Sequence, residues 1–203
     1  MIPRPPVALL ESFAPSFIAD PNLEEWVRDT ILFPGGALEN PDHAHLQQAD
    51  IAWLWTNVEN TRSGRRIIGQ ARLMPPTGEK WSAGMSAAHI TAMCGRMPDF
   101  LGVLDAAAVS EMDDWQLCAL IEHECYHMAQ KTDEFGEPMF HKETGQPLWT
   151  MRGHSVEEFT GVVRRYGATS PDLADMVRSV NRGPEVTAVQ ISRACGTCLR
   201  VVK

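Results

Sequence analysis

His123 and His127 stand four residues apart in the segment His123-Glu124-Cys125-Tyr126-His127. On a helix this spacing places both imidazoles on one face, about one turn apart, where they can reach a single metal ion. Glu124 follows the first histidine and can contact a water that such an ion activates. The pattern predicts hydrolysis at a Zn²⁺ site, with His123 and His127 as ligands and Glu124 as general base. The alternative is a surface helix whose histidines are merely solvated and bind no metal.

A catalytic zinc site needs a third protein ligand, because it usually has three and leaves the fourth position open. The candidates downstream are His141, His154, Glu157 and Glu158. We favour His154, because it directly precedes Ser155, where we expect a short turn into a helix to aim the side chain. Glu157 or Glu158 is the alternative ligand. His141 lies in a stretch with Gly and Pro, which predicts an exposed loop.

The first helix is the clearest element of the sequence. Asp113 with Gln116 three residues later is a capping-box pattern. Apolar residues then recur at helical spacing, which predicts a helix that runs to about Gln130 or Lys131. Residues 132–149 are polar, with several Gly and Pro, and are typical of a loop. The first helix therefore carries the two histidines of the motif.

A second helix is predicted from Ser155, because Glu158 three residues later repeats the capping-box pattern and an apolar stripe follows. We therefore expect His154 at the start of this helix and the two helices to meet at one metal. Tyr166, on the same helix, is a candidate catalytic residue that could donate a hydrogen bond to a developing oxyanion.

Three segments rich in β-branched and aromatic residues predict strands: 51–55, 66–73 and 100–104. A turn-like composition at 60–64 predicts that the first two are paired. Residues 100–109, which contain Gly102 and several small residues, are our candidate for a cleft-lining edge strand that pairs with extended peptide, with an ordinary buried strand as the alternative.

Bulk properties bound the class of protein. The chain has 203 residues, 44% hydrophobic and 22% charged, as in a folded globular domain. The net charge of −8 argues against a broad phosphate-binding surface, although a local basic patch remains at 62–66. No apolar run approaches the roughly 20 residues that cross a bilayer. We therefore expect no membrane association and a cytoplasmic location.

The five cysteines do not form the dense framework of a small secreted protein. Cys195 and Cys198 form one Cys-x-x-Cys pair, whereas a zinc ribbon needs two. A shared zinc half-site, a redox pair and two tail cysteines without function all remain open for them. Cys125 is a weak candidate for a nucleophile, because residues two apart on a helix point to different faces.

The segments Ala119 to His127 and Arg152 to Phe159 resemble the putative phage metallopeptidase family, and the aromatic strand at 51–55 is similar to that family's amino-terminal part. A more distant similarity is to SprT and Spartan-type proteases, whose third ligand is a His in a Gly-His-Gly segment. Here Gly153-His154-Ser155 replaces it, with Ser155 in the place of the second Gly. The resemblance implies an α+β, zincin-like metallopeptidase fold, with a small, mostly antiparallel sheet packed on the active-site helix and additional helices.

These observations predict a zinc metallopeptidase that acts on a protein or peptide substrate, in the host cytoplasm if it is phage-encoded. The domain would span residues 49–168, with an N-terminal extension, 1–48, that packs a helix on it and a C-terminal helical tail, 169–203. Asp20 or Asn22 could cap the N-terminal helix, and further helices are expected after Pro171 and Pro184. The alternative function is a catalytically silent zincin-fold binding or assembly protein of phage origin.

Overall fold

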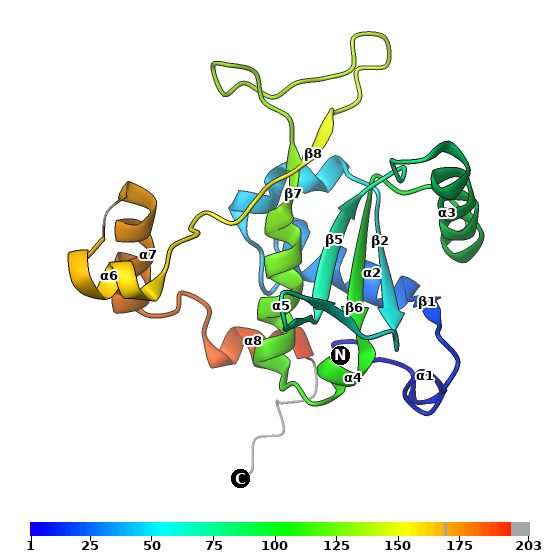
Figure 1. The fold of residues 1–203 in the computed structure, drawn as a ribbon, viewed down its shortest axis with the longest axis horizontal. Helices are drawn as coiled ribbons and strands as arrows, with labels where there is room; N and C mark the ends of the chain where they lie inside the picture. The colour runs from blue at the N-terminus through cyan, green and yellow to red at the C-terminus, as the bar shows by residue number, and fades with distance from the viewer. Residues whose placement is uncertain (169, 196–203) are drawn as a thin grey trace.

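A four-stranded mixed sheet lies at the centre of the molecule, with helices on both of its faces (Figure 1). The computed structural model describes residues 1–168 and 170–195. The strand order is β1 (Phe17–Ala19), β2 (Ile51–Thr56), β6 (Phe100–Asp105) and β5 (Gly69–Leu73). β1 and β2 are antiparallel, as are β5 and β6, whereas β2 and β6 are parallel. The predicted α+β class is confirmed, with a sheet that is mixed.

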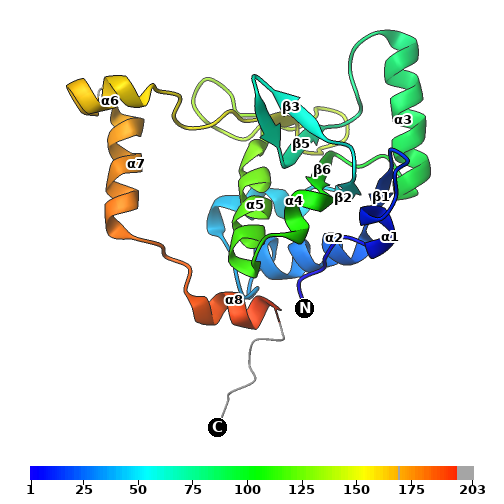
Figure 2. The ribbon, with the colours of Figure 1, turned by 60° about the horizontal axis from the view of Figure 1, so that its bottom comes forward.

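The side chains of β2 pack alternately into two separate cores, because successive residues of a strand point to opposite faces of the sheet. Trp53 and Trp55 belong to a large core with α2 (Pro21–Val27), the π-helical turn η1 (Arg28–Leu32) and α5 (Asp114–His127). The opposite face forms a smaller core with α3 (Lys80–Cys94). Figure 2 shows α3 on one side of the sheet and α2 and α5 on the other.

The remaining elements surround this centre. They are α1 (Val7–Leu10), the 3₁₀ helix η2 (Pro41–Gln48), the ladders β3 (Asn60–Arg62) with β4 (Arg65–Ile67) and β7 (Met128–Gln130) with β8 (Trp149–Met151), α4 (Ala106–Ser110), α6 (Thr160–Tyr166), α7 (Pro171–Arg182) and α8 (Ala188–Cys195). In Figure 1, α6 and α7 stand away from the sheet, beyond α5. No helix among the described residues has the length and apolarity to cross a membrane.

Two strand predictions need correction. Segments 51–55 and 66–73 are not neighbours, because β6 lies between β2 and β5, and residues 60–67 form their own hairpin. Residues 100–109 are not an edge strand either, since β6 is central and α4 follows it. Gly102 is explained by close packing, because a Cβ there would lie 2.4 Å from Cε3 of Trp53. The sheet edge beside α5 is β5.

The helix predictions were partly right. The capping box of Asp113 and Gln116 is present, and α7 and α8 follow Pro171 and Pro184 as expected. However, α5 ends at His127, because Met128–Gln130 pairs with β8. The second capping box is absent: Glu158 accepts a hydrogen bond from the N–H of Phe159, and α6 begins only at Thr160.

His154 therefore lies in an extended segment after β8, and only one helix, α5, contributes to the histidine cluster. The apolar stripe expected behind Ser155 has little to pack against, since the Phe159 side chain is 80% exposed. Of the Cys-x-x-Cys pair, Cys195 ends α8 in the large core, and Cys198 lies outside the described residues.

Candidate metal centre

Three imidazoles converge at the C-terminal end of α5. Nε2 of His123 lies 3.3 Å from Nε2 of His127 and 3.3 Å from Nε2 of His154. All three candidate ligand atoms lie within 4.8 Å of one another. The two histidines of the helix and the one favoured from the sequence are thus brought together, and this group is one that could hold a metal ion.

The spacing of the nitrogens agrees with a tetrahedral ion. Such an ion, at about 2.0–2.1 Å from each imidazole nitrogen, separates neighbouring nitrogens by about 3.3–3.4 Å. Burial lowers the pKa of His123, and the neighbouring His127 and His154 lower it further. The neutral ring that binds metals is therefore favoured at His123.

Arg152 ties the segment that carries His154 to the end of α5. Its N–H donates to the carbonyl of His127 at 2.8 Å, and its own carbonyl accepts from Nδ1 of His127 at 2.7 Å. Its Nε donates to the carbonyl of Tyr126 at 2.9 Å. Because a carbonyl can only accept, the proton of a neutral His127 ring sits on Nδ1, which leaves Nε2 free to bind a metal.

Glu124 is held between α5 and the edge strand. Its side chain is 3% exposed, and Oε2 accepts a hydrogen bond from the N–H of Ala71 in β5 at 2.7 Å. Burial raises the pKa of this carboxyl, while the Ala71 N–H and His127 oppose the rise. Gly69 makes room for the side chain, because a Cβ there would lie 2.6 Å from Oε1.

Three hollows open on the centre. The one beside Tyr126 and Met176 is lined by the three histidines, and the other two are both lined by His123 and Glu124. Of these two, the first, of about 560 Å³, lies along α5, and Met112, Trp115 and Leu120 contribute apolar groups to its wall. The second, of about 770 Å³, lies between β5, the β3–β4 hairpin and the segment 151–154. Together they form a cleft that can hold several residues of an extended chain.

The other predicted site residues lie in different surroundings. Glu157 lines the second hollow, so a carboxylate is also near the three histidines. Glu158 is engaged with the N–H of Phe159, and His141 is exposed in the loop before β8. Tyr166 is 68% exposed in α6, where its ring lies 5.4 Å from the guanidinium of Arg165, and it lines none of the three hollows.

Sequence reasoning missed three contributors to the site: Gly69, Ala71 and Arg152. Ala71 and Arg152 hold Glu124 and His127 through backbone groups, which any residue type can supply, so no pattern of side chains could reveal them. For Gly69, its place as the single glycine within the predicted strand 66–73 was a usable signal of a close approach.

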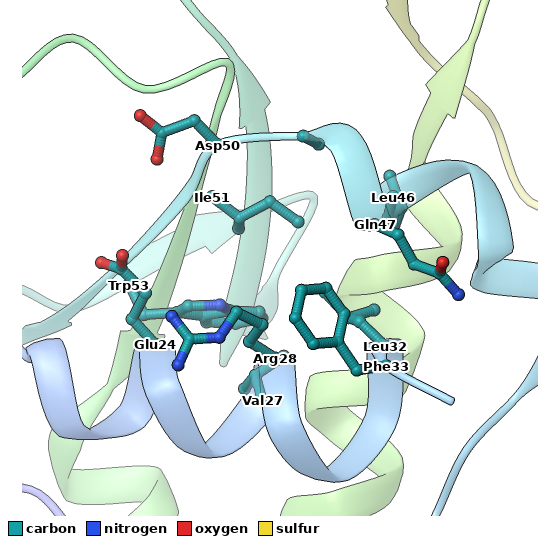
Figure 3. A pocket seen from close by; sticks show the side chains of 11 residues that line it. Glu24, Val27, Arg28, Leu32, Phe33, Leu46, Gln47, Asp50, Ile51 and Trp53 are labelled. Carbon is teal, nitrogen blue, oxygen red and sulfur yellow. The ribbon is translucent and has the colours of Figure 1, made fainter. Parts of the chain in front are cut away.

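A smaller cavity, of about 150 Å³, lies away from the histidines between α2, η1 and the start of β2 (Figure 3). Charged groups at its rim are already paired, since Arg96 donates to the carboxylates of Glu24 and Asp50. The guanidinium of Arg28 lies 5.9 Å from the centre of the Phe33 ring. Because ligand pockets usually measure roughly 300–1,000 Å³, we assign no ligand to this cavity.

One comparison, with models of known protein families, gives a match that agrees with this geometry. The model of the family described as "Putative phage metallopeptidase" matches residues 16–181, which is more than half of the chain. No curated protein and no solved structure matches the chain.

Proposed function

Because the chain belongs to the putative phage metallopeptidase family, we propose that it is a zinc-dependent peptidase with His123, His127 and His154 as the metal ligands. The observation that carries the proposal is the 3.3 Å spacing of the Nε2 atoms beside a buried glutamate. The helix with its HExxH segment and the adjoining sheet support a zincin-like fold for the chain. Zn²⁺ is favoured because three imidazoles with an open position are typical of catalytic zinc.

Glu124 acts as the general base in this proposal. Zinc at such a site supplies Lewis acidity, which lowers the pKa of water to about 7 and polarises a carbonyl. The Ala71 N–H holds Oε2 of Glu124 and leaves Oε1 to accept a proton from the attacking water. The same oxygen then delivers the proton to the leaving amine. His127 keeps its orientation through Arg152, which fixes its ligating nitrogen.

Tyr166 is not part of this mechanism, because its exposed side chain lines neither hollow of the cleft. Glu157 is the alternative third ligand, since it borders the same hollow as the three histidines. Substitution of each candidate separates the two assignments.

Metal analysis of the purified protein and cleavage of a disordered protein such as casein test the proposal. We expect one zinc per chain. Glu124→Gln should retain the zinc and lose cleavage by at least a hundredfold, because general acid–base catalysis contributes about 10²–10⁴-fold. His154→Ala should lose zinc, whereas Glu157→Gln should keep it. An active Glu124→Gln variant, or a wild type without stoichiometric zinc, contradicts the mechanism.

The same measurements address a catalytically silent scaffold, which is the rival from another functional class. Such a protein would bind zinc through the same histidines and cleave neither casein nor itself. Chelator-sensitive cleavage that disappears in Glu124→Gln would exclude the silent scaffold.

A further inference from the structure

We propose that the cleft selects peptides with an acidic side chain on one side of the scissile bond and a bulky apolar side chain on the other. This inference rests on the proposed peptidase function and assigns it a substrate class. It follows from the different chemistry of the two hollows that meet at His123 and Glu124.

The β3–β4 hairpin presents two arginines to the second hollow. Ser63 and Gly64 form its two-residue turn, with φ values of 51° and 74°, as expected for a tight hairpin with both central residues left-handed. Arg62 and Arg65 flank the turn and are cross-strand partners. They therefore share a face of the hairpin, and both line the hollow that also holds the three histidines.

Neither arginine takes part in an ion pair between described residues, although the carboxylates of Glu124 and Glu157 line the same hollow. Like charges directly opposite each other destabilise a hairpin, so an anion that enters between them would relieve the repulsion. The neighbouring Arg66 differs, because its guanidinium donates to the buried carboxylate of Asp105 at 2.7 Å. Among the ion pairs between described residues, none includes Arg62 or Arg65. The pair is thus free to bind a carboxylate of the substrate.

The first hollow has the opposite character. Trp115, Ala119 and His123 follow one another at intervals of four on α5 and so lie along one face of the helix. The side chains of Ile68, Met112 and Leu120 complete an apolar wall that reaches His123 and Glu124. Trp115 is 38% exposed and lines the same hollow, so its apolar surface is accessible to a ligand. A bulky apolar side chain next to the scissile bond would cover it.

A peptide fits this pair of hollows better than a nucleic acid does. Nucleic-acid grooves usually present many Lys and Arg along the backbone track, whereas this chain has a net charge of −8. The second hollow is lined by three arginines, Arg62, Arg65 and Arg152, and also by the carboxylates of Glu124 and Glu157. Two partly exposed charges suit one or two carboxylates, and the apolar hollow suits a single side chain.

The experiment maps cleavage sites in a randomised peptide library by mass spectrometry. For zinc-loaded wild type, we expect Asp or Glu to be enriched on one side of the cut and Leu, Phe or Met on the other. Arg62→Glu/Arg65→Glu should invert the acidic-to-basic preference by about tenfold, a change that weakens at high salt. Trp115→Ala should lower kcat/KM for bulky apolar residues about tenfold while leaving the acidic preference intact. Arg164→Glu/Arg165→Glu, on exposed α6, makes the same change in net charge, is the matched control and should keep the wild-type profile.

A binding measurement separates failure of this inference from failure of the peptidase proposal. In the Glu124→Gln background, labelled acidic and lysine-containing peptides are compared by fluorescence anisotropy, which needs no turnover. Preference for the acidic peptide that is lost in the double arginine variant supports the inference even if no library peptide is cut. Equal affinity for both peptides overturns it. So does a wild-type cleavage profile without acidic enrichment, or a labelled oligonucleotide that binds through the same two arginines more tightly than the peptide.

Discussion

Gly69→Ala should disable the proposed general base without touching the metal ligands. The added Cβ would lie 2.6 Å from Oε1 of Glu124, whereas ordinary contacts begin at 3.4 Å. Either the carboxylate or β5 must therefore move by about 0.8 Å. β5 is held along its length by β6, so we expect the carboxylate to give way.

The size of the effect follows from this displacement. A misplacement of about 1 Å at a catalytic group can cost roughly a hundredfold in rate. We therefore expect Gly69→Ala to lower kcat between about tenfold and a hundredfold. Zinc content should remain one per chain, because the atoms nearest to the added Cβ belong to Glu124 and Leu120 and not to a histidine. Overpacking in a close-fitted site should also lower the free energy of unfolding by about 1–3 kcal/mol.

The assay compares kcat, zinc content and urea unfolding for three glycine-to-alanine variants. Gly84→Ala, in α3, meets nothing within 4 Å and should leave kcat unchanged. Gly102→Ala would press a Cβ to 2.4 Å from Trp53 and controls for lost stability without a direct contact to the carboxylate. If Gly69→Ala keeps kcat within twofold of wild type, Glu124 does not act from the position described. If it loses zinc together with activity, the damage is not specific to the base.

Two further predictions concern buried groups near the centre. The side chain of His43 is fully buried, and burial is the main reason that its pKa is lowered to about 4. Because the pKa in the unfolded chain is about 6.5, the unfolded chain takes up a proton first as the pH falls. The stability that neutral His43 provides is therefore complete above pH 6.5 and is lost as the pH falls toward 4. Between pH 7.5 and 5, urea unfolding in the presence of chelator should show wild type losing about 2 kcal/mol more than His43→Phe, and parallel curves would refute this assignment. Burial also raises the pKa of the Cys125 thiol far above its ordinary range. Peptide mapping should therefore find Cys125 unalkylated in the folded protein, and Cys125→Ala should keep zinc and activity. Loss of activity with zinc retained would support the nucleophile hypothesis for Cys125.

The features that could be predicted from the sequence are those that depend on residues close together along the chain. The cap at Asp113 and the periodicity of α5 are local, and both are present in the structure. The pair His123 and His127 follows from helix geometry alone, so its placement could be predicted from spacing. The order of the strands could not be, because the parallel pairing of β2 with β6 joins segments about 50 residues apart through tertiary contacts.

The position of His154 was likewise only partly predictable from the sequence. Its proximity to the other histidines was anticipated, but the route was wrong, since a local capping pattern at Ser155 yields no helix where the apolar stripe has no surface to cover. The chain instead leaves β8 and is held by Arg152 against the last carbonyl groups of α5. The backbone hydrogen bond from Arg152 to His127 has no signature in residue types.

The position of this segment would give metal binding a structural role in addition to a catalytic one. His123 and His154 are 31 residues apart, and the loop of residues 131–148 between them projects from the body of the molecule (Figure 1). An ion shared by both residues would add a removable cross-link to the β7–β8 ladder, which already closes the base of that loop. A ligand that binds only the folded state adds about 4 kcal/mol when present at a thousandfold excess over its Kd. Metal supply would then set how firmly the segment that carries His154 stays on α5, while the β7–β8 ladder holds the base of the loop with or without the ion.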